Sequence, residues 1–250
     1  IELSIDIQLQ EYAEQLMLNK KGSIVAIEPS TGEILSLVSS PYYDPNLLVG
    51  RSRSPNFNRM YKDANKALFD RSLLAEYPPG STFKLVNALI GLQEGVIYDG
   101  TRFTCDEGWR FSAKLKIGCH AHRSPLNLIE SIEQSCNAYY CNTFRRIIEK
   151  YPTAAAGYEN WRNHVLSFGL GKFLDNDLYT GRPGRVPTVD FYNKQYGEKR
   201  WKAPTVISLA IGQDALVVSP IQMANMTAML ANRGFYYTPH IVKSISGQES

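Results

Sequence analysis

A serine and a lysine three positions apart, Ser81 and Lys84, are the pair in this sequence best suited to nucleophilic chemistry. Pro78, Pro79 and Gly80 form a rigid turn before them, and an apolar helical pattern follows, so we expect both residues in the first turn of a helix. A serine hydroxyl attacks an acyl group once a base takes its proton, and a lysine acts as that base when burial lowers its pKa. The helix N-terminus also offers the Ser81 backbone N–H as an oxyanion donor. The pattern therefore predicts acyl transfer through Ser81.

A second short motif, Ser135-Cys136-Asn137, lies between two predicted helices. A tight connection there would direct Ser135 and Asn137 into one cleft, where Ser135 relays a proton between Lys84 and a leaving amine and Asn137 binds a substrate amide. Each motif alone also fits a plainer interpretation, a serine that caps a helix and a polar side chain that faces solvent. Their combination favours the chemical one.

Several segments, in this order along the chain, resemble the transpeptidase domain of penicillin-binding proteins. The run from Tyr77 to Lys84 resembles the turn that carries the nucleophile in that family, and Ser135 to Asn137 resembles its second motif. Further segments resemble the opening strands of the family and the stretch that leads toward its third motif: Gly22 to Ser39, Ala210 to Gln213, and Val218 to Ala224. The likeness covers nearly the whole chain and is greatest to penicillin-binding protein 2, the elongation-specific class B type.

The resemblance implies an α+β fold of the penicillin-binding and serine β-lactamase type, with an antiparallel sheet flanked by helices. It implies a peptidoglycan D,D-transpeptidase that needs no cofactor for catalysis and serves cell elongation and shape. Ser81 would attack the penultimate D-Ala carbonyl of a stem peptide and release the terminal D-Ala. An amine of a neighbouring stem would then take the acyl group to form the cross-link, and β-lactams would acylate Ser81 in the same way.

Two other functions stay open on the sequence alone. A serine β-lactamase shares the same two motifs but hydrolyses its acyl-enzyme, and the sequence offers no strong candidate for a deacylating base. A non-catalytic β-lactam sensor or wall-peptide-binding domain is the other, because the third family motif, Lys-Thr/Ser-Gly, does not occur in these 250 residues. We interpret residues 1–250 as a transpeptidase domain that is incomplete at its C-terminal end, with the third motif expected after Ser250.

Three cysteines and a histidine near the second motif form a candidate metal site: Cys105, Cys119, His122 and Cys136. Thiolates and imidazoles are the preferred ligands of structural zinc, and four of them make a closed tetrahedral site. Some penicillin-binding protein 2 members hold a zinc near the second motif through Asp, His and Cys, so the resemblance matches His122 and Cys136, with Cys105 and Cys119 in place of carboxylates. A Cys105–Cys119 disulfide and ordinary buried thiols are the alternatives.

Composition sets the broad class of the chain. Hydrophobic residues make up 44% and charged residues 20%, which is ordinary for a folded domain. The net charge of +3, without a basic run that contains aromatic residues, argues against nucleic acid as a partner. No apolar run approaches the roughly 18 residues of a membrane helix.

Location and partners follow from the resemblance alone. It implies a membrane anchor outside this chain, with the catalytic domain in the periplasm at the inner membrane. The implied partners are stem peptides that end in D-Ala-D-Ala, β-lactams, and a SEDS-type glycosyltransferase of the elongation machinery.

Periodicity predicts the elements that must position the site. Asp6 suits the cap of a helix that ends near Asn19, and residues 23–28 and 33–39 form a predicted hairpin around the turn at Pro29–Gly32. Four further helices are predicted: Ser81 to Gly95, Ser124 to Gln134, Ala138 to Lys150, and Pro220 to Arg233. Residues 41–60 and 169–204 are predicted to be irregular excursions, and more strand is expected after Tyr236.

Overall fold

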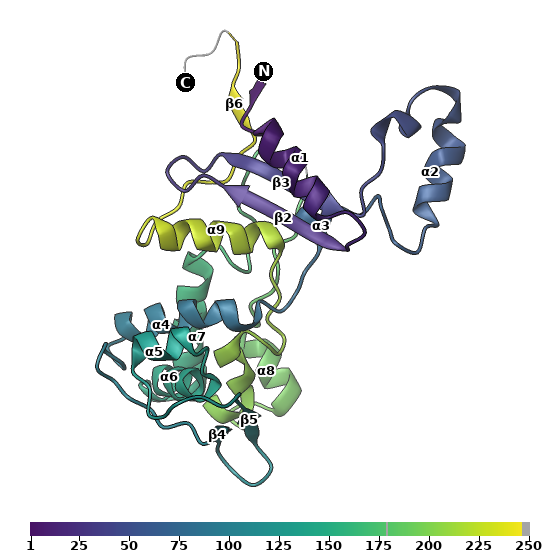
Figure 1. The fold of residues 1–250 in the computed structure, drawn as a ribbon. Helices are drawn as coiled ribbons and strands as arrows, with labels where there is room; N and C mark the ends of the chain where they lie inside the picture. The colour runs from purple at the N-terminus through teal and green to yellow at the C-terminus, as the bar shows by residue number, and fades with distance from the viewer. Residues whose placement is uncertain (179, 247–250) are drawn as a thin grey trace. The chain divides into compact units, whose positions relative to one another are not determined.

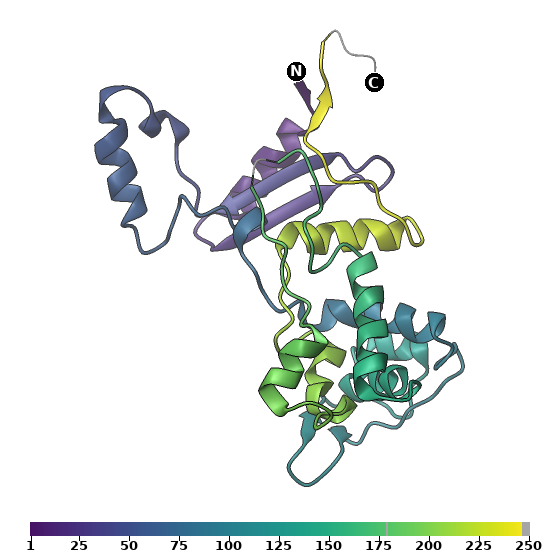
Figure 2. The same ribbon diagram turned by 180° about the vertical axis from the view of Figure 1, so that it is seen from behind.

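The computed structural model describes residues 1–178 and 180–246 (Figures 1 and 2). Helices and short antiparallel sheets alternate along the chain, which confirms the predicted α+β class. Among the described helices, none has the length and apolar character needed to cross a bilayer. Residues 247–250, where the approach to the third family motif was expected, lie outside the described residues.

The chain forms two compact units, whereas the sequence was interpreted as one transpeptidase domain. Unit 1 contains Ile1–Tyr77, Lys172–Gly184 and the chain from Val218 onward. Unit 2 contains Pro78–Gly171 and Arg185–Val217. The stretch 169–204, predicted to be an irregular excursion, is divided between the units, because one part packs with each of them.

Unit 1 is built on the predicted hairpin. Strands β2 (Gly22–Ile27) and β3 (Ile34–Ser40) pair antiparallel. Three helices pack against them: α1 (Ile7–Leu16), α3 (Arg71–Leu74) and α9 (Pro220–Ala231). Asp6 caps α1 as predicted, since its carboxylate accepts the Leu9 N–H at 3.0 Å.

The two faces of the hairpin bury different neighbours. Ile24 and Val38 are cross-strand partners on one face, and Val25 and Leu37 are partners on the other. The first pair packs with Ala13 and Met17 at α1, and the second packs with Leu73 of α3 and Ile221 of α9. Alternation along the strands therefore gives both faces of this two-stranded sheet an apolar covering.

The ends of the described chain meet within unit 1. Strand β1 (Glu2–Leu3) pairs antiparallel with β6 (Val242–Ser244), so strand does follow Tyr236 as predicted. The Asp177 carboxylate accepts the N–H groups of Ile241 and Val242 at 2.8–3.0 Å, which fixes the segment from Lys172 against this strand pair.

Residues 41–60 were predicted to be irregular, and this prediction was wrong. They contain two short 3₁₀ turns, η1 (Pro45–Leu48) and η2 (Gly50–Ser52), followed by helix α2 (Arg53–Tyr61). Helix α2 accommodates Pro55 because a proline in the first turn of a helix removes no helical hydrogen bond. We call residues 42–66 the arm.

Unit 2 is mostly helical. A 3₁₀ turn, η3 (Gly80–Phe83), runs directly into α4 (Lys84–Gln93). The remaining elements are β4 (Gly108–Arg110), β5 (Lys116–Gly118), α5 (Leu128–Glu133), α6 (Asn137–Glu149), α7 (Ala154–Ser167), α8 (Val189–Tyr196) and the 3₁₀ segment η4 (Ala203–Ile211). Their core is aromatic, and its fully buried rings belong to Phe83, Tyr139, Tyr140, Phe144, Tyr158, Trp161 and Tyr192.

Two sequence predictions for unit 2 need correction. Helix α8 lies inside the stretch that was predicted to be irregular, because Thr188 caps it and Tyr192 anchors it in the core. Helix α5 begins at Leu128 rather than at Ser124, because Asn127 and Glu130 form a reciprocal capping box there.

A buried carboxylate fixes the C-terminal end of α4. Glu94, which follows that helix, accepts hydrogen bonds of 2.8–2.9 Å from Lys150, Tyr151, Asn160 and His164. Burial alone would raise its pKa, but these hydrogen bonds lower the pKa of Glu94 to about 2. The carboxylate thereby joins α4 to α7 and to the end of α6.

Candidate active site

The nucleophile candidate Ser81 is exposed and lies in the η3 turn. A 3₁₀ helix has three residues per turn, so the side chains of residues i and i+3 eclipse, which aligns Ser81 with Lys84. Gly80, at φ +63°, makes the sharp approach to this turn, and its N–H donates to the Gly212 carbonyl at 2.9 Å. The predicted position near the start of a helix is thus correct, with a 3₁₀ turn in place of the first α-helical turn.

The turn rests on the end of η4. Gly212 has φ +67°, and a Cβ there would clash with the Gly80 carbonyl and lie 2.7 Å from the Phe83 Cβ. One helical turn beyond Lys84, the buried Asn87 donates to the carbonyls of Leu209 (3.3 Å) and Ala210 (2.9 Å). The nucleophile turn and the first turn of α4 are therefore held by close contact with the end of η4.

Lys84 is buried, with only 3% of its surface exposed. Its Nζ donates to the Ser135 carbonyl at 2.6 Å and to the Ser135 Oγ at 2.9 Å. Burial lowers the pKa of Lys84 below its ordinary value, and the charges of nearby thiolates, Cys119 first, oppose that shift. A lowered pKa increases the share of neutral amine, the form that accepts a proton.

Ser135 lies at the sharp connection between α5 and α6, as the sequence predicted. Its φ is +46°, a left-handed conformation that is uncommon for serine and reverses the chain direction in one residue. This reversal brings both its carbonyl and its hydroxyl to Lys84. The two short motifs, about fifty residues apart in sequence, are therefore joined by one hydrogen-bonded lysine.

Asn137 begins α6 and faces the β4–β5 hairpin. Its side-chain Nδ2 donates to the Gly118 carbonyl at 2.8 Å, and its backbone N–H donates to the Cys119 Sγ at 3.3 Å. The orientation of the Asn137 amide is thus set by the loop that carries the candidate metal ligands.

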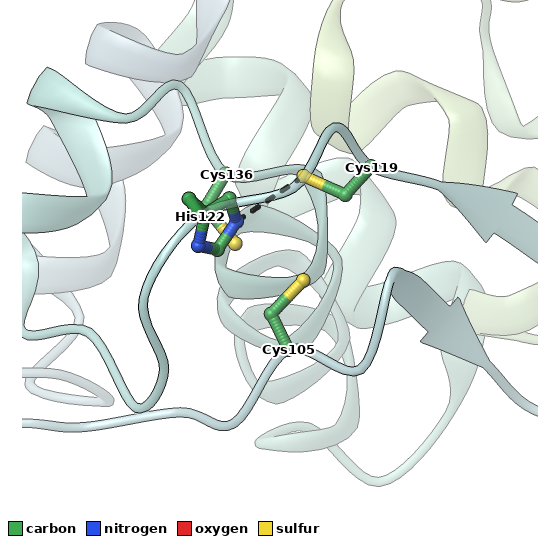
Figure 3. A group of neighbouring side chains, drawn as sticks. All are labelled: Cys105, Cys119, His122 and Cys136. Atoms are coloured by element: carbon green, nitrogen blue, oxygen red, sulfur yellow. Dashed lines mark hydrogen bonds between the residues drawn. The ribbon is translucent and has the colours of Figure 1, made fainter.

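The four candidate metal ligands lie together, as Figure 3 shows. The ligand atoms of Cys105, Cys119, His122 and Cys136 all lie within 4.8 Å of one another. The Cys119 Sγ is 3.4 Å from the His122 Nε2, and the Cys136 Sγ also accepts the Tyr139 N–H at 3.4 Å, which caps α6. In tetrahedral zinc sites the ligand atoms lie about 3.3–3.8 Å apart at bond lengths of about 2.0–2.3 Å, so this cluster needs only small shifts to hold the metal.

The thiols of the cluster differ in acidity. Burial raises the pKa of Cys136 to about 12. Burial would also raise the pKa of Cys119, but hydrogen bonds from the Asn137 N–H and His122 lower it overall. All four cysteines of the described chain are free thiols, and Cys141 is buried in the core.

Sequence reasoning missed the residues that support the nucleophile turn. Asn87 interrupts an apolar helix face, and a buried amide needs partners, so its position was a usable signal. Its Oδ1 accepts the Trp161 indole N–H at 2.8 Å, which completes its hydrogen bonding. Gly212 carried no local signal, because its close contact with Gly80 spans about 130 residues.

Comparison with known proteins identifies the family of the chain. Residues 22–250 match the family model described as the penicillin binding protein transpeptidase domain. The peptidoglycan D,D-transpeptidase MrdA of Acinetobacter baumannii is 30% identical over 249 residues, which cover 98% of this chain and 35% of that protein. The chain thus spans about a third of the length of this curated relative.

Two solved structures share the fold. Penicillin-binding protein 2 of Pseudomonas aeruginosa in complex with WCK 5153 has a TM-score of 0.87 and 32% sequence identity to this chain. The match covers 99% of this chain and 55% of the P. aeruginosa chain. Penicillin-binding protein 2 of Helicobacter pylori, in a complex with MreC, has a TM-score of 0.85 and 26% sequence identity. The match covers 99% of this chain and 44% of the H. pylori chain.

Proposed function

Because the chain belongs to the penicillin-binding protein transpeptidase family, we propose that this protein is a peptidoglycan D,D-transpeptidase of the elongation-specific class B type. The observation that carries the proposal is the buried Lys84 Nζ, one 3₁₀ turn after Ser81 and 2.9 Å from the Ser135 Oγ. These three groups supply a nucleophile, a base and a route for its proton.

In the acylation step, Ser81 Oγ attacks the carbonyl carbon of the penultimate D-Ala while neutral Lys84 takes the hydroxyl proton. The resulting tetrahedral oxyanion lies at the start of the helix, where the Ser81 N–H donates to it. The C–N bond to the terminal D-Ala then breaks, and its nitrogen receives a proton from Lys84 through the Ser135 hydroxyl. Ser81 ends as an ester, and free D-Ala leaves.

The second step reverses this proton path. An amine from a neighbouring stem peptide attacks the Ser81 ester, loses a proton through Ser135 to Lys84, and forms a new amide bond. The Ser81 oxygen leaves and regains a proton from Lys84. The proposal assigns Asn137 to the substrate, with its Oδ1 accepting an amide N–H of the donor stem while its Nδ2 stays on Gly118.

We also propose that the cluster of Cys105, Cys119, His122 and Cys136 holds a structural zinc ion. Three sulfurs and one imidazole nitrogen form a donor set that zinc prefers, and the atoms already converge within 4.8 Å. The ion would fix the loop that orients Asn137 and the residue next to Ser135, and it would take no part in acyl transfer. Metal analysis of protein purified without chelators checks the proposal: one zinc per chain is expected, and metal-free protein with a Cys105–Cys119 disulfide contradicts it.

Location and partners extend the same proposal. We assign the domain to the periplasm, held at the inner membrane by an anchor outside this chain, with D-Ala-D-Ala stem peptides and β-lactams as ligands. The H. pylori relative in a complex with MreC supports a place in a larger assembly. A SEDS-type glycosyltransferase of the elongation machinery is the partner we propose.

Labelled penicillin tests the function directly. The intact protein should form a long-lived adduct at Ser81, identified by peptide mass spectrometry, and Ser81→Ala should form none. Rapid turnover of the adduct would identify a β-lactamase instead. Failure of a folded, intact protein to react would remove the enzyme proposal and leave a binding domain.

A further inference from the structure

The arm, residues 42–66, holds the whole charge excess of the chain. The sequence has 27 basic and 24 acidic residues, and the arm contains five of the basic and two of the acidic ones. The rest of the chain is therefore balanced, and the net charge of +3 is concentrated in one tenth of its length. The five basic residues are Arg51, Arg53, Arg59, Lys62 and Lys66.

Ion pairs do not compensate these cations in the described part of the chain. Across the described residues, none of the five takes part in an ion pair. The two acidic residues of the arm cap backbone turns instead: Asp44 accepts the Asn46 N–H at 2.9 Å, and Asp63 accepts the Asn65 N–H at 3.1 Å. Five exposed like charges repel one another, so an anion that binds several of them lowers the electrostatic free energy of the arm.

Exposed aromatic rings lie among the cations. Phe57 and Tyr61, one helical turn apart on α2, have nearly parallel rings, with centroids 6.1 Å apart and an angle of 17°. Tyr61 is 74% exposed and Phe57 46%. Such rings stack on the apolar faces of sugars, and they offer contact area at little cost in side-chain entropy.

The arm is held in place although it lacks a core of its own. The Asn56 Nδ2 donates to the Leu47 carbonyl at 2.8 Å, which ties α2 to η1. At the base, the buried Arg71 guanidinium donates to the carbonyls of Asn65 (2.6 Å) and Lys66 (3.2 Å). Figures 1 and 2 both show α2 standing away from the β2–β3 hairpin, with the chain leaving β3 before it and returning to α3 after it. The basic and aromatic side chains are therefore presented on a fixed support.

From these observations we propose that the arm binds the wall polymer itself, a glycan with carboxylate-bearing peptide stems, at a place distinct from Ser81. Arginine pairs with carboxylates in two parallel hydrogen bonds, and the ring pair offers faces to the sugars. The other exposed side chains of α2 and η2 are mainly serine and asparagine, which hydrogen-bond to hydroxyl and acetamido groups. A bilayer fits less well, since an interfacial helix needs a broad apolar face and α2 has only this ring pair and the buried Met60.

The inference rests on the proposed function, which makes this polymer the substrate. A transpeptidase that holds the polymer through the arm would keep further stems bound to the same molecule that carries the acyl-enzyme. The effective concentration of the acceptor would rise without any new contact at the site of chemistry.

Co-sedimentation with purified peptidoglycan sacculi tests the inference on the intact protein, with its active site blocked by penicillin. The variant Arg53→Gln/Arg59→Gln/Lys62→Gln should weaken binding by about tenfold. The matched control Lys114→Gln/Lys194→Gln/Arg200→Gln removes the same charge from exposed sites of unit 2 and should leave binding unchanged. Raising salt from about 0.1 M to about 0.5 M should weaken binding of the wild type and the control more than that of the arm variant.

The aromatic contribution has its own variant. Phe57→Ala/Tyr61→Ala should lower the binding that persists at high salt, because stacking is not screened. Acylation of Ser81 by labelled penicillin, measured on every variant, should stay at the wild-type rate. That readout separates the two proposals. Failure of the wild type to be acylated contradicts the proposed transpeptidase function. Equal binding to sacculi by the arm variant and the wild type contradicts polymer binding by the arm.

Two further outcomes would overturn the inference. Equal loss of binding in the unit 2 control would show that total charge, rather than the arm, is responsible. Tighter binding to vesicles of phosphatidylcholine and phosphatidylglycerol in equal parts than to sacculi would assign the arm to a lipid surface.

Discussion

Helix α4 of unit 2, which follows the Ser81 turn, and the arm of unit 1 differ in the environment of their charged side chains. The side chains of Lys84 and Glu94, at the two ends of α4, are largely buried, Lys84 is hydrogen-bonded to Ser135, and Glu94 is hydrogen-bonded to Lys150. The basic residues of the arm are exposed and unpaired among the described residues. The difference indicates that charge is used inside α4 to position and activate groups, and on the arm to attract a partner. If this contrast holds, substitutions in or against α4 should affect acylation and stability more than a substitution in the arm does.

The largest effect is expected from Lys84→Met, which keeps the length of the side chain and removes its amine. Loss of the base should slow acylation of Ser81 by about 10²–10⁴-fold. In the wild type the acylation rate should rise with pH and level off below pH 10.5, because the neutral lysine is the active form and burial lowers its pKa. Stopped-flow acylation with labelled penicillin measures both, and Lys114→Met is the exposed control.

Gly212→Ala should disturb the nucleophile turn next most. The new methyl group would clash with the Gly80 carbonyl, so we expect a loss of several kcal/mol in stability together with at least tenfold slower acylation. Gly95→Ala is a matched control, because Gly95 has a similar φ of +65° and open space around its Cβ position. It should cost about 1–2 kcal/mol, from backbone strain alone, with acylation unchanged. Equal acylation by both folded variants would show that contact at Gly80 does not position Ser81.

Glu94→Gln should lower the free energy of unfolding by about 3 kcal/mol at pH 7, as the fall in pKa from 4.5 to about 2 implies. Because the folded-state pKa lies below the unfolded one, this contribution is complete above pH 4.5 and is lost as the pH falls toward 2. Urea melts at pH 7 and pH 3 should therefore show a smaller gap between wild type and variant at the lower pH. Glu149→Gln, which removes an exposed pair with Arg145, should cost no more than about 0.5 kcal/mol.

The smallest effect is expected in the arm. Asn56→Ala removes the hydrogen bond to Leu47 and should change global stability by less than about 1 kcal/mol, since the arm has almost no core to lose. Hydrogen exchange should instead speed up at the amides of α2 alone. Faster exchange in α4 as well would mean that the arm and the nucleophile helix are not energetically separate.

Sequence patterns predicted the local parts of this structure well. The β2–β3 hairpin follows from β-forming runs around a Pro-Gly turn, and α1 and α9 follow from caps and apolar periodicity. The convergence of four metal-ligand candidates was also predicted from residue type and spacing. Each of these depends on chemistry that neighbouring residues carry.

What the sequence did not reveal depends on distant contacts. Helix α8 is rich in polar residues, and burial of Tyr192 against Tyr158 and Trp201 anchors it, so its periodicity alone was too weak to predict it. The support of Ser81 by Gly212 needs two glycines from separate segments to meet. No spacing rule contains that information, because tertiary packing decides it.

The pairing of β1 with β6 has a consequence for synthesis of the protein. Glu2 pairs with Ser244, so β1 has no partner until the ribosome has reached residue 244, about 240 residues later. At roughly 5–20 residues per second, that delay is about 12–50 s. The apolar face formed by Val25 and Leu37 is covered only in part, by residues such as Leu73 of α3, until α9 emerges. Over that interval the nascent chain presents an unpaired strand edge, the feature that holdase chaperones shield from aggregation.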